Sequence, residues 1–406
     1  MHPKDLKIED FTYELPDENI AYKPVEPRDS SKLLIYKNHK ISDDIYRNLK
    51  QHLPQDAVLV FNDTRVIKSR IKFQRQTGAI IEIFCLEPNE EFVDYAVHFQ
   101  KTEKDQWRCL VGNIAKWKEP FLEKTISVQN QEVLLTAKLI DRLPDSNVVE
   151  FSWTPKEISV GEIIENAGLT PLPPYIKREA KKEDESTYQT VYSSHEGSVA
   201  APTAGLHFSQ EMLQGFKEKH IPTLFTTLHV GAGTFKPVSS EKMADHVMHN
   251  EWMDISIDFL KQLESQLNKT IISVGTTSTR TLESIYWMGN KICNNPDISI
   301  EELCITQWEP YEDITLHSSE SAVSTLIQWM KERHMQHLII ETGIIIAPSY
   351  KFKIIKGLIT NFHQPKSTLL LLVAALVGKN WKDIYAYALQ NNFRFLSYGD
   401  GSLLMR

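Results

Sequence analysis

The sequence predicts an α/β protein in which a small β-barrel domain is inserted into a larger mixed α/β domain. Continuous apolar runs such as 57–61 and 271–275 are followed by turn-forming or helix-like residues, which is typical of buried strands in an α/β sheet. Between about 69 and 153, short runs of alternating apolar and polar residues are separated by polar turns, which is typical of an antiparallel barrel or sandwich. We therefore assign 1–68 and 154–406 to the α/β domain and 69–153 to the inserted domain.

The composition favours a cytoplasmic globular protein of two domains. A chain of 406 residues is longer than one core supports, because single cores stop growing near about 250–300 residues. The four cysteines include no CxxC pair, which fits a reducing compartment. The longest apolar stretch, 369–377, is far shorter than the roughly 20 residues of a membrane span. The formal net charge of −8 argues against a generally basic nucleic-acid-binding protein, although a local basic patch can act alone.

The inserted domain is predicted to be built from short strands. Its alternating segments are 79–84, 95–99 and 132–140. The chain returns to a helical pattern at 155–168, and a proline-stiffened loop follows at 169–179.

The α/β domain is predicted to alternate strands with capped helices. Ser209 can cap one helix, and Ser367 or Thr368 can cap another that Gly378 ends. The expected elements are strands at 223–230 and 271–275, a strand pair or one bent strand at 337–347, and helices at 210–220, 278–288, 320–334 and 368–377.

Several segments place small residues beside a histidine or an arginine where an apolar strand ends. Such a pattern suggests backbone that approaches a ligand at the edge where open α/β sheets bind their ligands. The segments are 58–71, 188–208, 227–238, 246–252, 274–284, 357–368 and 393–402. His246 and His249 have a metal-compatible helical spacing but no convincing third ligand, so we predict no metal site.

Together these segments resemble the S-adenosylmethionine:tRNA ribosyltransferase-isomerase family of queuosine biosynthesis. The resemblance is carried by "SVAAPTAGLHF", "LHVGAGTF" and "VGTTSTRTLES", and it covers the chain from residue 10 onward except for about 287–341. It implies a transfer of the ribosyl group of S-adenosylmethionine, as co-substrate, onto 7-aminomethyl-7-deazaguanine at the wobble position of tRNA. Epoxyqueuosine is formed, adenine and methionine leave, and no bound cofactor is required.

This reaction needs a general base, because the sulfonium acidifies the neighbouring ribose 5′ protons. A base with a pKa near neutrality favours histidine. His207 and His229 are the two candidates, and each could instead be a structural histidine of the core or of a strand end. Glu251 and Asp400 are carboxylates that could contact the sulfonium or the incoming amine, or could be ordinary hydrogen-bonding residues.

The opening of "SVAAPTAGLHF" is expected to form a wall against the nucleoside. Its candidate binding residues are Pro202, Thr203, Ala204, Gly205 and Phe208, and a structural proline-glycine turn is the alternative. Gly231 and Gly233 would let the backbone approach the ligand in "LHVGAGTF".

Two helix starts are further candidates for substrate contacts. Thr276, Thr277 and Arg280 open one helix, where Arg280 could clamp a carboxylate or phosphate, or could pair with Glu283 or another acid. His363 and Lys366 precede another helix, whose N–H groups could hold the methionine carboxylate or a tRNA phosphate. A simple N-cap with a surface lysine is the alternative there.

A tRNA partner needs positive charge despite the net charge of −8. The candidate contacts are Lys68, Arg70, Lys72, Lys177 and Arg178. Solubilising charges on the surface are the alternative reading of these residues.

The chain departs from the family pattern at Ser349, Lys356 and Gln364, where glycine, aspartate and leucine are usual. The extra segment 287–341 either decorates the fold or caps the cleft. The alternatives to the tRNA reaction are therefore a same-family enzyme with a different acceptor and a non-catalytic RNA- or protein-binding paralogue.

Overall fold

The larger part of the molecule is built on a nine-stranded mixed sheet. The computed structural model describes residues 2–231, 238 and 240–406. The strand order is β16-β14-β13-β3-β15-β17-β18-β1-β2. The four central strands run parallel: β13 (Thr223–His229), β3 (Ala57–Asn62), β15 (Thr270–Val274) and β17 (Gly357–Asn361). They are flanked by β16 (His337–Thr342), β14 (Glu251–Ser256), β18 (Gly401–Met405), β1 (Lys32–Lys37) and β2 (Lys40–Ile45).

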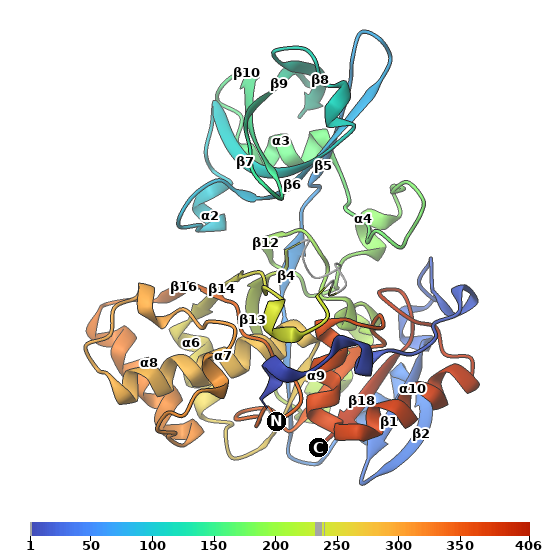
Figure 1. Ribbon diagram of the computed structural model, residues 1–406, viewed down its shortest axis with the longest axis vertical. Helices are drawn as coiled ribbons and strands as arrows, with labels where there is room; N and C mark the ends of the chain where they lie inside the picture. The colour runs from blue at the N-terminus through green and yellow to red at the C-terminus, as the bar shows by residue number, and fades with distance from the viewer. Residues whose placement is uncertain (1, 232–237, 239) are drawn as a thin grey trace.

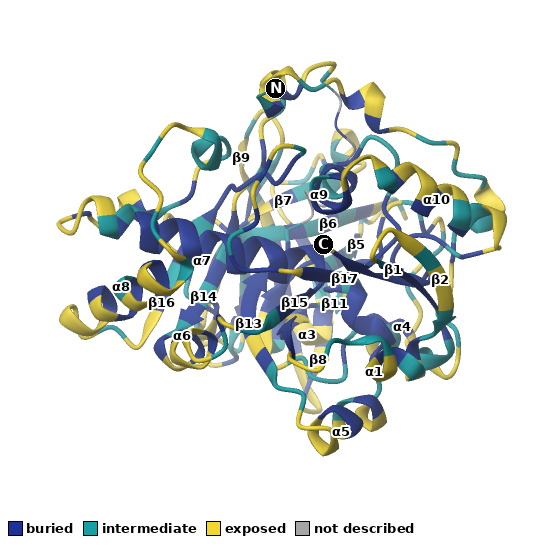
Figure 2. Cartoon of the chain, turned by 90° about the horizontal axis from the view of Figure 1, so that it is seen from below, coloured by how far each residue is buried: buried dark blue, intermediate teal, exposed yellow. Residues whose placement is uncertain are grey.

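Other elements cover both faces of this sheet, because strand β3 carries apolar side chains on both of its faces. Val58 and Val60 of β3 face one core, and Leu59 and Phe61 face another, because side chains alternate along a strand. The first core is closed by α6 (Ile257–Glu264), α7 (Thr276–Asn294), α8 (Ser319–Glu332), α9 (Thr368–Val377) and α10 (Trp381–Gln390). The second is closed by α1 (Leu49–His52) and α5 (Gln210–Glu218), and Figure 2 shows the buried sheet between the two layers.

The predicted helix caps are confirmed. Ser209 Oγ accepts the N–H of Met212 at 3.3 Å, and Ser367 Oγ accepts the N–H of Leu370 at 3.2 Å. Each hydroxyl satisfies one of the N–H groups that a helix start leaves without an intrahelical partner.

The segment 287–341 is built into the α/β part of the fold. It supplies the second half of α7, all of α8, which packs on α7, and most of β16, which pairs antiparallel with β14 at the sheet edge. The prediction of a strand pair or one bent strand at 337–347 is confirmed only for its first part, since β16 ends at Thr342 and 343–347 is irregular.

A second, seven-stranded antiparallel sheet stands at one end of the molecule (Figure 1). Its order is β11-β5-β6-β7-β10-β9-β8, and it packs with α3 (Val160–Ala167) around a core of its own. Its strands are β5 (Arg70–Gln74), β6 (Ile80–Pro88), β7 (Lys104–Gly112), β8 (Leu122–Val128), β9 (Gln131–Arg142), β10 (Asn147–Thr154) and β11 (Gly168–Leu169). The described residues show no strand pairing between its two ends, so the structure shows a curled half-barrel here and does not confirm the predicted barrel.

Three short elements lie near the junction of the two large sheets. The strand predicted at 95–99 is wrong: Tyr95–His98 form one helical turn, α2, because Asp94 accepts the N–H groups of Ala96 and Val97 and so caps a helix start. The strands β4 (Thr64–Val66) and β12 (His195–Ser198) pair in parallel between the two large sheets.

Across the described chain, no helix has both the length and the apolar character needed to cross a bilayer.

Candidate active site

A pocket of about 730 Å³ lies at the carboxyl ends of three parallel strands of the large sheet. Val230 follows β13, Gly275 follows β15 and Phe362 follows β17, and all three residues line the pocket. The segment 200–204 after β12 and Ser367 at the start of α9 complete the wall. This is the edge at which open α/β sheets bind their ligands, because the connecting loops diverge there.

The pocket gathers six of the residues predicted to bind substrate. They are Pro202, Thr203, Ala204, Thr276, Thr277 and His363. The described lining residues include no aspartate, glutamate, lysine or arginine, and their only titratable side chains are those of Tyr175 and His363. Apart from these two side chains, the walls offer apolar surface, hydroxyl groups and the amides of Asn361 and Gln364, which suits an uncharged heterocycle and a ribose.

His363 is held in the pocket wall through its backbone and its ring. Its N–H donates to the Tyr385 hydroxyl at 3.1 Å, and its carbonyl accepts from the Tyr13 hydroxyl. Its Nε2 lies 2.9 Å from Thr360 Oγ1. Burial lowers the pKa of His363 to about 3, so the ring is neutral at physiological pH and carries a lone pair on one nitrogen.

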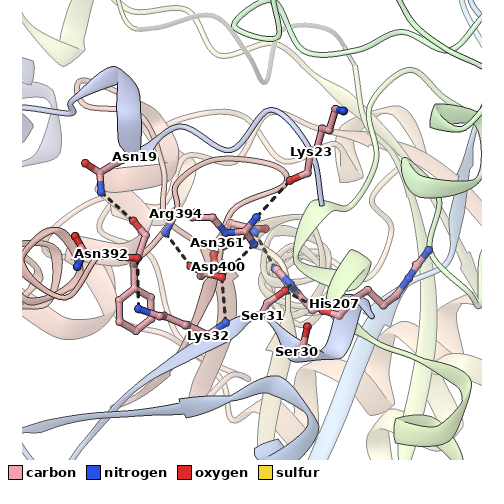
Figure 3. A network of polar contacts seen from close by, with 12 residues as sticks. Asn19, Lys23, Ser30, Ser31, Lys32, His207, Asn361, Asn392, Arg394 and Asp400 are labelled. Carbon is pink, nitrogen blue, oxygen red and sulfur yellow. Dashed lines mark hydrogen bonds and ion pairs between the residues drawn. The ribbon is translucent and has the colours of Figure 1, made fainter. Parts of the chain in front are cut away.

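His207 lies behind the pocket wall and does not line the pocket. Its Nδ1 is 3.0 Å from Ser31 Oγ, and its Nε2 is 3.0 Å from Asn361 Nδ2 (Figure 3). Because an amide nitrogen only donates, Nε2 accepts and Nδ1 carries the proton. The ring stacks on Tyr46 with centroids 4.2 Å apart, and burial lowers the pKa of His207 to about 3. Both ring nitrogens are thus used inside the protein, and they orient Asn361, which does line the pocket.

His229 lies at the junction between the two large sheets and outside this pocket. Its ring is 4.3 Å from the ring of Tyr95, and its Nδ1 is 3.2 Å from Thr64 Oγ1. Burial lowers the pKa of His229 to about 3. It borders a different space of about 830 Å³, together with His195, whose pKa is raised by a hydrogen bond to Asp63. The structure therefore does not bring the two predicted bases, His207 and His229, into one site.

Arg280 and Glu251 form a buried ion pair with each other. The guanidinium also donates to two backbone carbonyls at 3.2 Å, from Thr342 and Ile344. The alternative partner named from the sequence, Glu283, accepts N–H groups of the loop before β17 instead and does not contact Arg280. Arg280 is engaged within the fold and lies outside the pocket, so it does not clamp a ligand there.

Several other predicted binding residues also lie outside the pocket. Gly205 packs against Tyr192, and Phe208 is fully buried in the core below β3. Gly231 donates its N–H to Glu251 Oε1 at 3.3 Å. Gly233 lies outside the described residues.

Asp400 and Lys366 are paired within the protein. Asp400 accepts the N–H groups of Lys32 at 3.0 Å and Arg394 at 2.8 Å, and it also pairs with the Arg394 guanidinium (Figure 3). Lys366 forms an ion pair with Glu9 at 2.8 Å. These contacts agree with the structural alternative for both residues.

Other polar residues of the pocket have no counterpart among the sequence candidates. Thr360 and Asn361 end strand β17, so the strand-end rule that selected His363 could also have selected them. Tyr175 and Ser397 come from distant loops and hydrogen-bond to each other across the pocket wall. No local pattern marks that pair.

Comparison with known proteins decides the family. The profile of the family described as "Queuosine biosynthesis protein" matches residues 8–404. The chain belongs to this family. A protein of Halothermothrix orenii named S-adenosylmethionine:tRNA ribosyltransferase-isomerase is 35% identical over 98% of this chain and 100% of the relative. A protein of the same name from Rickettsia bellii is 34% identical, over 99% of both chains. A crystal structure of S-adenosylmethionine tRNA ribosyltransferase from Thermotoga maritima covers 98% of this chain and 100% of its own, at 26% identity and a TM-score of 0.45.

As a member of the queuosine biosynthesis family, the chain is an enzyme of the transferase-isomerase class, which confirms the expectation from its motifs. Of its three departures from the family pattern, only Gln364 lines the pocket. Lys356 precedes β17 at the opposite end of that strand, and its Nζ donates to the carbonyl of Lys269 at 2.6 Å. Ser349 borders a separate cavity, and no described residue of 287–341 lines the pocket.

The predicted tRNA-contacting cations mostly have carboxylate partners. Arg70, Lys72, Lys177 and Arg178 line one groove of about 760 Å³ between the curled sheet and the loop 169–180. The ion pairs are Lys68 with Glu165 and Glu185, Arg70 with Glu82, Lys72 with Glu179, and Arg178 with Asp184. Within the described chain, Lys177 alone of the five has no carboxylate partner.

The two groups of possible metal ligands lie away from the pocket. His246 and His249 are in an irregular segment before β14, so they do not have the helical spacing that the sequence suggested. Glu90, His98 and Asp105 approach one another beside the curled sheet, where His98 Nε2 bonds to Asp105 at 2.7 Å and Glu90 pairs with Lys101.

Proposed function

We propose that the pocket binds S-adenosylmethionine and transfers its ribosyl group to the aminomethyl group of 7-aminomethyl-7-deazaguanine at the wobble position of tRNA. The transfer isomerises the sugar to the epoxide of epoxyqueuosine and releases adenine and methionine. The proposal rests on one observation. Four motif segments that lie far apart in the sequence meet in this pocket, at the ligand-binding edge of the sheet: 200–204, Val230, 275–277 and 360–367. The relatives' names supply the substrate classes.

We assign the general base to His363, in place of His207 and His229. Four histidines are buried in the described structure, His98, His207, His229 and His363, and of these only His363 lines the pocket. When its Nε2 proton is donated to Thr360 Oγ1, Nδ1 holds the lone pair that removes a ribose 5′ proton. Burial holds the pKa of His363 at about 3, below the near-neutral value expected of a general base, so the assignment rests on its place in the pocket and on the acidity that the sulfonium gives the 5′ proton. The carbanion beside the sulfonium breaks the C4′–O bond of the ribose, and the opened sugar expels adenine, which takes up a proton, and leaves an aldehyde at C1′. The aminomethyl nitrogen adds to C4′ and loses a proton, and the carbanion that this regenerates at C5′ bonds to C1′. The resulting C1′ oxygen anion displaces methionine from C5′ and closes the epoxide, and methionine leaves with the sulfonium electron pair.

The tRNA would approach over the groove at the curled sheet, where Lys177 is the cation without a carboxylate partner in the described structure. We also propose that this sheet, over about 69–153, is a separate inserted domain, and that the enzyme is cytoplasmic. A different acceptor remains the second candidate function. Gln364 is the observation that favours it, because it is the one departure from the family pattern inside the pocket.

The test incubates the protein with S-adenosylmethionine and tRNA that carries 7-aminomethyl-7-deazaguanine, and follows adenine release and the mass of the modified nucleoside. The expected result is one adenine for each epoxyqueuosine formed. His363→Gln should lower the rate about 10²–10⁴-fold, the usual contribution of a positioned base. His337→Gln, at an exposed residue that begins the edge strand β16, is the matched control and should retain activity. Adenine release without any change in tRNA mass would reject the proposal that this tRNA is the acceptor. Full activity of His363→Gln would reject the proposal that His363 is the general base.

A further inference from the structure

Three places near the pocket could bind an anionic group of the substrate. At two of them, the protein's own side chains already make the contacts that such a group would make. Arg280 is engaged by Glu251 and by backbone carbonyls. The N-terminus of α9 is capped by Ser367, and Lys366 beside it pairs with Glu9. The third place is the N-terminus of α7, and it differs from the other two.

The start of α7 has no side-chain cap. Its N-cap residue is Gly275, and the first main-chain bond of the helix runs from the N–H of Thr279 to the Gly275 carbonyl. The N–H groups of Thr276, Thr277 and Ser278 therefore precede the intrahelical ladder. Gly275 has φ of +92°, which only glycine adopts without strain, and it brings the backbone directly to the pocket wall.

The hydroxyl of Thr277 is a second, independent sign of a ligand. The residue is 8% exposed and lines the pocket, and its Oγ1 has no hydrogen-bond partner in the described structure. The neighbouring hydroxyls of the helix behave differently: those of Ser278, Thr279 and Thr281 each donate to a carbonyl one turn earlier. A buried hydroxyl without a partner is costly, and a bound acceptor would remove that cost.

We propose that the first turn of α7, with its free N–H groups and Thr277 Oγ1, binds the carboxylate of the methionine part of S-adenosylmethionine. This inference rests on the proposed function. A helix N-terminus carries partial positive charge and suits one anionic group. A carboxylate at the end of a small ligand can reach backbone that lies among buried residues. A tRNA phosphate is joined to nucleotides on both sides, and these would have to enter the pocket with it. The substrate's sulfonium and ammonium charges meet no competing cation among the described lining residues.

The test compares ligands with and without the carboxylate by calorimetric titration of the whole protein. S-adenosylmethionine is compared with its decarboxylated analogue, L-methionine with L-methioninol, and inorganic phosphate serves as the probe for a phosphate site. We expect each carboxylate ligand to bind about 10–100-fold more tightly than its partner, the range of hydrogen bonds to a charged group. Thr277→Val should reduce this preference about tenfold or more and leave the decarboxylated analogue's affinity unchanged. Thr277→Ser, which keeps the hydroxyl, should retain the preference.

Thr281→Val is the matched control, because Thr281 lies one turn further along α7 and its hydroxyl bonds to the helix backbone. It should keep the wild-type preference for the carboxylate. Equal weakening of both S-adenosylmethionine and its decarboxylated analogue by Thr277→Val would overturn the inference. Phosphate binding that depends on Thr277 and exceeds methionine binding would also overturn it, in favour of a tRNA phosphate. A Thr277-dependent carboxylate preference without adenine release would uphold this subsite and reject the proposed transfer.

Discussion

The buried histidines of this protein differ in what their ring nitrogens can reach, and this decides their roles. His207 and His363 have the same lowered pKa of about 3, but only His363 lines the pocket. The partners of His207 come from Ser31 and Asn361, 176 and 154 residues away in sequence. A motif shows that a histidine is present beside small residues, but it cannot show that distant side chains occupy both nitrogens. For that reason the sequence suggested His207 as a base, whereas in the structure both of its ring nitrogens bond within the protein and the residue lies outside the pocket.

The low pKa of His207 makes the folding stability depend on pH. Between about pH 3 and pH 6.5 the unfolded chain protonates this histidine and the folded chain does not, so stability falls as the pH falls. From pH 7 to pH 5 the loss is about 2 kcal/mol for one such group. Urea denaturation of His207→Gln should therefore show a pH 7 to pH 5 difference about 2 kcal/mol smaller than that of the wild type. A variant with the wild-type difference would show that His207 is protonated in the folded state.

At the scale of the element, the two serine caps recognised in the sequence predicted helix starts correctly, whereas a third local cap, that of Asp94, was overlooked. Ser209 and Ser367 cap the helices that their positions indicated. The segment 95–99 alternates like a strand, yet Asp94 caps a helical turn there, and Tyr95 packs against His229 of the other sheet. That contact is tertiary, so alternation alone could not reveal it.

The pairing of α7 with α8 gives an element-scale prediction. A Cβ at Gly289 of α7 would overlap the carbonyl group of Ala322 in α8. Gly289→Ala gains about 1 kcal/mol of helix propensity but forces two buried helices apart, which costs about 1–3 kcal/mol or more. We expect a net loss of stability, measured as a lower urea midpoint. Gly215→Ala in α5 is the matched control: its Cβ would lie 3.5 Å from the mobile Lys50 Nζ, so the propensity gain of about 0.5–1 kcal/mol should remain. Stabilisation by both variants would show that α7 and α8 can separate at no cost.

At the scale of the whole molecule, the pocket belongs to one sheet and the predicted tRNA groove borders the other. The pocket is lined from the large sheet and its loops, whereas Arg70 and Lys72 of the groove belong to β5 of the curled sheet. The sequence predicted this division from the change in hydrophobic pattern. It could not predict that the curled sheet stays open, because the pairing of end strands depends on register and curvature over all seven strands.

The separate cores of the two sheets predict separate unfolding. Phe73 is fully buried in the core of the curled sheet, and Phe216 is buried in the core between the large sheet and α5. Truncation of either ring to alanine leaves a cavity and costs about 3–5 kcal/mol. In scanning calorimetry we expect two transitions, with Phe73→Ala lowering one and Phe216→Ala lowering the other. The sheets touch through contacts such as Tyr95 with His229 and Phe92 with Trp252, and we expect these not to join the two separate cores into one cooperative unit. A single transition whose temperature both substitutions lower equally would instead mean that the two cores unfold together. The curled sheet would then belong to the same folding unit as the pocket.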